Sequence, residues 1–225
     1  MTEETIGSRR RAAVRLKAAR KHKPSSQKWL LRQLNDPYVA AAKERGFRSR
    51  AAFKLIELDE KFGLIGKGVR VVDLGAAPGG WTQVALERGA ARVVGIDLLE
   101  IDPIAGATLI KGDFQDESME MALAEALGGP VDVVMSDMAP NTTGHTATDH
   151  LRIMGLAELA LDFAFKHLAP GGAFVTKLFQ GGAQGDMLNL LKRRFTQVRH
   201  AKPEASRKDS RELYLVATGY RPDAP

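Results

Sequence analysis

The amino-acid sequence predicts an α/β fold in which a doubly wound, mostly parallel sheet of seven strands forms a single domain. Five short, strongly apolar runs alternate with helical segments, a pattern typical of parallel strands covered on both faces by crossover helices. Two further β-like runs at the C-terminus are joined only by the short charged segment 202–211, which favours antiparallel pairing. A chain of 225 residues with 44% hydrophobic residues is long enough to build one substantial core.

The helices and strands are expected in the following order. A short helix begins after Ser26 and ends at the turn signal of residues 35–37, and a helix with an apolar side follows over about 50–62. Runs rich in Val, Ile and Leu predict five buried strands, at 69–74, 91–98, 107–113, 131–137 and 172–178. The segments after these strands predict helices at 79–88, 116–127, 149–168 and 184–195. The two C-terminal strands are expected at 196–201 and 212–220.

Charge is distributed unevenly along the chain. The net charge is +6, but residues 1–54 contain 15 Lys and Arg against 4 Asp and Glu, a net of +11. We therefore expect a basic, flexible N-terminal arm over 1–25 and a single domain over 26–225. Clustered lysines and arginines attract phosphates and release counterions on binding, so the arm predicts a nucleic-acid partner rather than a merely solvated tail.

The composition excludes several classes of protein. There is no cysteine, which removes disulfides, thiolate metal sites, iron–sulfur clusters and cysteine nucleophiles. No apolar run approaches the roughly 20 residues of a membrane helix, there is no signal-peptide core, and Glu3 and Glu4 argue against a mitochondrial transit peptide. We expect a cytoplasmic, monomeric protein that makes no membrane contact and requires no metal.

A glycine-rich turn follows the first strand. Gly75, Gly79 and Gly80 allow a tight turn and close approach of a ligand to the backbone, and a helix N-terminus follows. Asp73 precedes the turn, and Asp97 ends the second strand, where a carboxylate accepts hydrogen bonds from both hydroxyls of a ribose. This pattern predicts a nucleoside-containing cofactor, either NAD or S-adenosylmethionine.

Two features favour S-adenosylmethionine. A dinucleotide fingerprint has glycine where Ala77 stands, and Pro78 has no N–H to offer a pyrophosphate. Asp113 and Phe114 follow the third strand, where the carboxylate can accept from an adenine amino group, although Asp113 also suits a helix N-cap. Asp137, at the end of the fourth strand, is expected near the sulfonium of the cofactor.

The absence of two sequence features reduces the number of chemical groups that could accept the methyl group. Residues 136–141 do not form the Asn/Asp-Pro-Pro-aromatic signature expected for methylation of exocyclic amines, and methylation at pyrimidine C5 needs a cysteine. A hydroxyl oxygen is therefore the leading acceptor. Lys177 ends an apolar run, and it either reaches into water or stands over a reaction site, because a lysine is almost never buried without a partner.

Five motifs follow one another along the chain: RSRAAFKL (48–55), DLGAAPGGW (73–81), SDMAPN (136–141), VTKLFQG (175–181) and SRELYLVA (210–217). In this order they resemble the FtsJ/RrmJ (RlmE) family of ribose 2′-O-methyltransferases across about residues 26–220. The resemblance implies a seven-stranded, Rossmann-like class I methyltransferase fold. It implies a catalytic set of Lys54, Asp137, Lys177 and Glu212. It places S-adenosylmethionine at Gly79, Trp81, Asp97, Asp113 and Asp137.

The implied substrate is a uridine ribose in the peptidyl-transferase A-loop of large-subunit rRNA, read within the assembled subunit. Lys177 would accept the proton of the 2′-hydroxyl or steer that hydroxyl, with Lys54 and Glu212 orienting both groups. The extended basic arm departs from the family pattern. The segment 142–150 is expected to be variable and to tune RNA contacts, and neither segment touches the catalytic set.

Three other functions remain open. A tRNA ribose methyltransferase would use the same four residues, and only the identity of the methylated nucleotide separates it. A non-catalytic RNA-binding protein with this fold should have lost one of the carboxylates, and all are present. A metal-dependent small-molecule O-methyltransferase would have no need of the basic arm.

Overall fold

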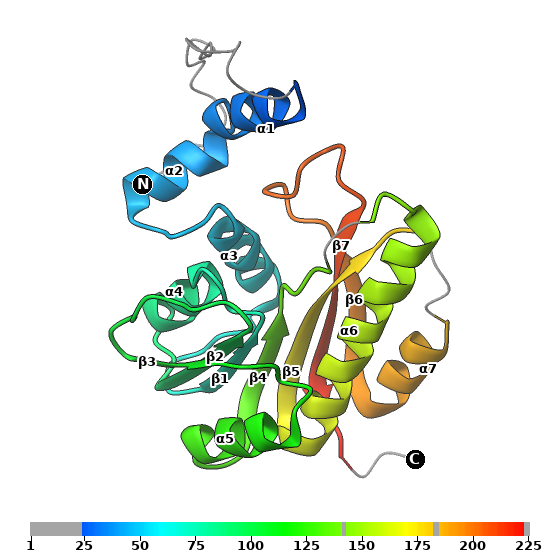
Figure 1. Cartoon of the computed structure of the whole chain (residues 1–225). Helices are drawn as coiled ribbons and strands as arrows, with labels where there is room; N and C mark the ends of the chain where they lie inside the picture. Colours follow the sequence, from blue (N-terminus) through cyan, green and yellow to red (C-terminus); the bar gives the residue numbers. More distant parts are fainter. Residues whose placement is uncertain (1–23, 141–142, 182–184, 223–225) are drawn as a thin grey trace.

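The computed structural model describes residues 24–140, 143–181 and 185–222 (Figure 1). Its elements are α1 (Pro24–Leu34), α2 (Pro37–Arg45), α3 (Ala51–Phe62), β1 (Arg70–Leu74), α4 (Gly80–Glu87), β2 (Arg92–Asp97), β3 (Ala107–Lys111), α5 (Glu117–Leu127), β4 (Val131–Ser136), α6 (Thr146–His167), β5 (Leu168–Phe179), α7 (Gly185–Arg194), β6 (Phe195–Ala201) and β7 (Glu212–Tyr220). Every expected strand and helix forms within four residues of its expected bounds. Up to residue 23, the basic arm lies outside the described residues.

The strands form one seven-stranded sheet in the order β3-β2-β1-β4-β5-β7-β6 (Figure 1). The first five strands are parallel to one another, and β7 runs antiparallel to both β5 and β6. The predicted fold class and the antiparallel pairing of the last two strands are therefore confirmed. The chain reverses direction across the sheet between β1 and β4, and ligands of such sheets bind beyond the carboxyl ends of the strands at this point.

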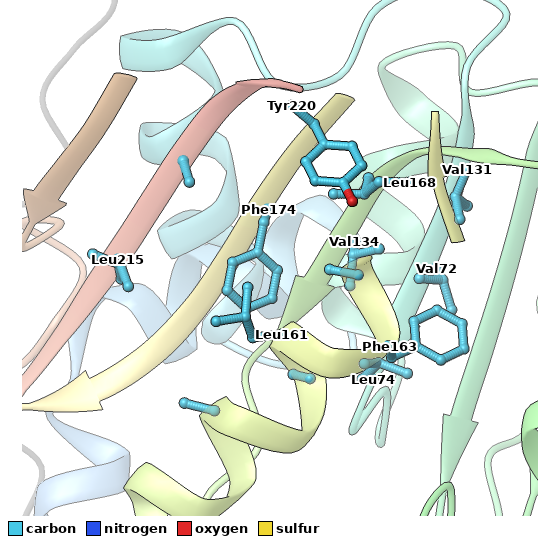
Figure 2. Close-up of a cluster of buried hydrophobic side chains, with 14 of the residues drawn as sticks. Val72, Leu74, Val131, Val134, Leu161, Phe163, Leu168, Phe174, Leu215 and Tyr220 are labelled. Carbon is cyan, nitrogen blue, oxygen red and sulfur yellow. The ribbon is translucent and has the colours of Figure 1, made fainter. Parts of the chain in front are cut away.

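The alternation of side chains along each strand supplies two hydrophobic cores. Val72 and Leu74 of β1 point to one face, where they pack with α5, α6 and α7, and Val71 points to the opposite face, toward α3 and α4. Figure 2 shows the first core, in which Leu161 and Phe163 of α6 lie beside side chains of β1, β4 and β5. Both faces of the sheet are thus covered by helices, and a ligand is expected at the carboxyl ends of the parallel strands.

The sequence missed helix α2. The signal at residues 35–37 predicts only a turn that ends α1, but Asp36 is the N-cap of a new helix and its side chain accepts from the Tyr38 N–H at 3.0 Å. Pro37 occupies the first turn, where its missing N–H costs no hydrogen bond. Gly46 ends the helix in the left-handed conformation. An Asp-Pro pair can therefore begin a helix as well as make a turn.

None of the helices in the described ranges has the length and apolarity that a membrane span requires.

Candidate active site

Four charged side chains from four segments meet at the carboxyl edge of the sheet. We call them the charged quartet: Lys54 of α3, Asp137 after β4, Lys177 of β5 and Glu212 of β7. The Lys177 Nζ lies 3.0 Å from Asp137 Oδ1, and it also donates to the Asp137 backbone carbonyl at 2.6 Å. The Lys54 Nζ lies 2.8 Å from Glu212 Oε1 and 3.8 Å from Asp137 Oδ2. Asp137 therefore connects both ammonium groups.

Glu212 reaches this edge because of the direction of its strand. Since β7 is antiparallel to β5, its first residue pairs with Phe179 near the end of β5, and Tyr214 pairs with Lys177. The N-terminal end of β7 thus lies beside the carboxyl ends of the parallel strands. A sequence separation of 35 residues between Lys177 and Glu212 becomes a two-residue offset across one strand pair.

The quartet is largely removed from solvent. The side chains of Lys54, Asp137, Lys177 and Glu212 are 9%, 17%, 7% and 15% exposed. Burial opposes ionisation of Asp137, but the Lys177 and Lys54 ammonium groups and hydrogen bonds from Tyr214 and Lys177 hold the pKa of its carboxyl below the ordinary value. Lys177 is therefore a buried, paired lysine rather than one that reaches into water.

Tyr214 is a residue of this site that the sequence analysis missed. Its side chain is fully buried, its hydroxyl donates to Asp137 Oδ1, and the Lys54 Nζ lies 5.7 Å from its ring centroid. Burial raises the pKa of Tyr214 well above its usual value, and the nearby Asp137 and Glu212 charges add to the rise, so the hydroxyl remains a donor. The available signal was its position two residues after Glu212, because alternate strand residues share a face.

Trp81 lies beneath the charged quartet. It is buried, its Nε1–H donates to the Ala51 carbonyl at 2.8 Å, and its ring centroid lies 5.7 Å from that of Tyr214. These contacts join α4 to α3 and support the Tyr214 ring. The indole is thus part of the packing under the quartet.

A cavity of about 720 Å³ opens at the carboxyl ends of β1, β2, β3 and β4 and extends to α6. We call it the Asp97 cavity. Five of the predicted cofactor residues line it: Gly75, Asp97, Asp113, Phe114 and Asp137. The other four are not among its lining residues: Asp73, Gly79, Gly80 and Trp81. Leu98, Leu99 and Met138 also line the cavity, and the sequence analysis named none of them.

The Asp97 carboxylate is held in place by two backbone N–H groups. Its Oδ2 accepts from Ala77 at 2.9 Å, and its Oδ1 accepts from Leu99 at 2.8 Å. Each oxygen keeps a second lone pair, so the fixed carboxylate can also accept from two hydroxyls. Asp113 accepts from the Gln115 N–H at 3.0 Å, and the N-cap of α5 is Asp116 rather than Asp113.

The glycines of the turn serve contacts within the protein. Gly79 has φ +109°, and a Cβ there would lie 2.6 Å from Ile104 Cδ1 and 3.3 Å from Arg48 Cδ. At Gly80 a Cβ would collide with the hydroxyl of Ser49. Both glycines therefore let neighbouring segments dock on the turn.

Asp73 lies beneath the turn and is fully buried. Its Oδ2 accepts from the Thr82 hydroxyl at 2.7 Å, and its Oδ1 has no hydrogen-bond partner among the described residues. Burial raises the pKa of Asp73 to about 7, and the charges of Asp137 and Asp97 contribute to the rise.

A second cavity, of about 410 Å³, lies on the other side of the charged quartet. Lys54 and Glu212 line it together with Arg32, Arg50 and Arg207, so we call it the arginine cavity. Asp137 faces the Asp97 cavity, whereas Lys54 and Glu212 face the arginine cavity. The quartet thus stands between two cavities that could hold a donor and an acceptor. In the described part of the chain, no group of three or more His, Asp or Glu is arranged to hold a metal ion.

Comparisons with known proteins identify the family of this chain. The family model of FtsJ-like methyltransferases matches residues 47–220. The chain is 97% identical, over 224 residues and 100% of both sequences, to "Ribosomal RNA large subunit methyltransferase E" of Acidiphilium cryptum (strain JF-5). A protein of the same name from Granulibacter bethesdensis is 69% identical over 210 residues, which are 93% of this chain and 91% of the relative.

A solved structure has the same fold. The crystal structure of a ribosomal RNA methyltransferase from Plasmodium falciparum matches with a TM-score of 0.69 and 32% identity, over 77% of this chain and 98% of that chain. The matched range 47–220 contains the whole charged quartet and all residues that line the Asp97 cavity. The chain belongs to the FtsJ-like methyltransferase family.

Proposed function

We propose that this protein transfers a methyl group from S-adenosylmethionine to the 2′-oxygen of a uridine ribose in large-subunit rRNA, within the assembled subunit. The observation that carries the proposal is the position of the charged quartet between an acidic cavity and a basic one. The relatives named as methyltransferases of large-subunit ribosomal RNA support the choice of substrate.

The Asp97 cavity suits the proposed cofactor. The fixed Asp97 carboxylate would accept from the two ribose hydroxyls, and Asp113 would accept from the adenine amino group. The ionised Asp137 carboxylate suits a neighbouring positive sulfonium. When bound, S-adenosylmethionine supplies an electrophilic methyl group. Leu98, Leu99 and Met138 would cover apolar parts of the cofactor.

Lys177 would act on the acceptor hydroxyl. Two of its hydrogen-bonding positions are directed to Asp137, which leaves one for the substrate. A neutral amine that donates both hydrogens to Asp137 would present its lone pair to the 2′-hydroxyl. As the new C–O bond forms and the S–CH₃ bond breaks, the hydroxyl proton would pass to this lone pair. Lys54, held by Glu212, would orient the acceptor from the arginine cavity.

The arginine cavity and the basic N-terminal residues would hold the RNA. Arg32, Arg50 and Arg207 line the cavity on the acceptor side, and the net charge of +11 over residues 1–54 adds a longer-range attraction for phosphates. The A-loop uridine and the assembled subunit are implied by the family resemblance, and they are the finer part of the proposal.

Methyl transfer to defined acceptors tests this function. Purified protein and methyl-labelled S-adenosylmethionine are incubated with large subunits from cells that lack the enzyme, with deproteinised rRNA from the same cells, and with tRNA. The expected result is one ribose methylation on rRNA in the subunit, with Lys177→Ala as the inactive control. Label in tRNA would favour the tRNA alternative, and label in none of the three would reject the proposal.

A further inference from the structure

Arg48 makes an unusual set of contacts just outside the Asp97 cavity. Its guanidinium donates to three backbone carbonyls: Pro78 at 3.2 Å, Asp102 at 2.6 Å and Pro103 at 2.8 Å. The backbone of Arg48 is fixed as well, because its backbone N–H donates to Gln83 Oε1 at 2.8 Å. Arg48 therefore joins the glycine turn after β1 to the connection between β2 and β3.

The connection that Arg48 holds forms part of the cavity wall. Residues 98–106 link β2 to β3, and Leu98 and Leu99 at its start line the Asp97 cavity. These two side chains are 66% and 67% exposed, so burial in the core does not fix them. Their position therefore depends on the backbone of the connection and on the contacts that anchor it.

Contacts at both ends and in the middle anchor this connection, and an exposed ion pair between Glu100 and Lys111, at 3.5 Å, adds only weakly to them. The Leu99 N–H donates to Asp97 at one end, and the Ile104 side chain lies over Gly79 at the other. Between them, the two bonds from Arg48 to Asp102 and Pro103 hold the middle of the segment. The third bond, to Pro78, holds the turn whose Ala77 N–H fixes the Asp97 carboxylate.

We propose that Arg48 is a positioning residue for the cofactor, which acts by holding the connection 98–106 and the glycine turn together around the Asp97 cavity. It orders two walls of the cavity before the cofactor arrives, so less ordering entropy is lost on binding. Arg48 acts through Leu98, Leu99 and Asp97 and does not line the cavity itself. The inference rests on the proposed use of S-adenosylmethionine.

Arg48→Lys tests this role and retains the positive charge. A lysine ammonium lacks the planar fork of the guanidinium, so it cannot reproduce the three bonds in their present geometry. We expect the Kd for S-adenosylmethionine, measured by calorimetry, to rise about tenfold or more, which corresponds to about 1.4 kcal/mol. The KM for S-adenosylmethionine should rise similarly, with kcat at saturation close to that of the wild type. Amide hydrogen exchange over 98–106 should also become faster.

Arg221→Lys is the matched control. Arg221 also donates to three backbone carbonyls, those of Lys192, Arg193 and Phe195, but it follows β7 at the opposite edge of the sheet. This variant should bind S-adenosylmethionine like the wild type. A general cost of replacing a carbonyl-bonding arginine would affect both variants equally, and that result would overturn the inference.

Two further outcomes decide the question. If Arg48→Lys binds S-adenosylmethionine like the wild type but binds RNA more weakly, with a shallower dependence on salt, Arg48 contacts phosphate and the inference is wrong. If the wild-type protein itself does not bind S-adenosylmethionine, the proposed cofactor is wrong whatever the Arg48 variants do. Faster exchange over 98–106 together with weaker cofactor binding in Arg48→Lys alone supports the inference.

Discussion

Lys177 contacts Asp137 twice, through its carboxylate at 3.0 Å and through its backbone carbonyl at 2.6 Å. The second contact does not depend on the ionisation of Asp137, so the Lys177 Nζ stays in place whether or not the carboxylate carries a charge. Lys177 itself lies in the continuous strand β5, which fixes its backbone. The pair is therefore suited to present one nitrogen atom at a constant position to an acceptor.

Replacing Lys177 separates proton acceptance from electrostatic support. Lys177→Ala should lower single-turnover methyl transfer by about 10²–10⁴-fold, the usual effect of removing a positioned proton-transfer group. Lys177→Arg keeps the charge but cannot lose a proton at working pH, so it should be nearly as inactive. Calorimetry should show that both variants bind S-adenosylmethionine. Near wild-type turnover in the Arg variant would leave Lys177 as an electrostatic anchor.

Replacing Tyr214 removes one donor from the Asp137 carboxylate. Tyr214→Phe keeps the ring against Trp81 but loses the hydrogen bond, and a bond to a charged group contributes about 1.5–3 kcal/mol. We expect the free energy of unfolding to fall by this order, and kcat to fall with unchanged KM for S-adenosylmethionine. Tyr220→Phe is the control, because that hydroxyl donates to the Phe165 carbonyl far from the quartet. An unchanged kcat in Tyr214→Phe would show that Asp137 does not need this donor.

Asp97 is predicted to hold the ribose of the cofactor. Asp97→Asn keeps the size of the side chain but loses the charge and one acceptor oxygen, so the Kd for S-adenosylmethionine should rise about 10–100-fold. Asp132→Asn is the matched control, since Asp132 also accepts from a backbone N–H, that of Arg70, at the other end of the sheet. Equal affinities of Asp97→Asn and the wild type, measured by calorimetry, would remove Asp97 from the binding site.

Asp73 should make stability depend on pH. Its pKa is raised to about 7 in the folded protein, whereas an unfolded aspartate titrates near 3.9. Between these values the folded state binds the extra proton, so the stabilisation is complete below about pH 4 and is lost as the pH rises through 7. From pH 5 to pH 7, the free energy of unfolding of the wild type should fall by roughly 2 kcal/mol more than that of Asp73→Asn. The free energies of unfolding are measured by denaturant titration at each pH. If those of the wild type and Asp73→Asn change with pH in parallel, Asp73 is ionised throughout this range.

The basic arm should act on RNA and not on the cofactor. Deleting residues 1–23, which ends before α1, removes eight lysines and arginines. RNA binding should weaken, and the plot of log affinity against log salt should become shallower, because fewer phosphates are neutralised. Affinity for S-adenosylmethionine should not change. A salt slope equal to that of the full chain would mean that the arm does not contact RNA.

Much of the fold follows from local sequence. Continuous apolar runs such as 69–74 and 131–137 form strands buried on both faces, because only a parallel sheet covered by helices hides such runs completely. Polar residues that follow these runs, Asp97 and Asp137 among them, must then share the carboxyl edge. The acidic side of the candidate site was therefore predictable from the ends of the strands.

The rest depended on tertiary structure. No local pattern specifies that β7 lies between β5 and β6, and this long-range pairing is what brings Glu212 and Tyr214 beside Lys177. Likewise, the glycines of the turn predict that another segment packs closely against it, but they do not indicate which one. At Gly79 the neighbouring side chains are those of Arg48 and Ile104. Local sequence thus predicts every strand, every helix except α2, and the residues that end the strands, because these features depend on periodicity over a few neighbours. Which distant side chains meet depends on the tertiary structure, because those contacts follow from the order and direction of whole strands.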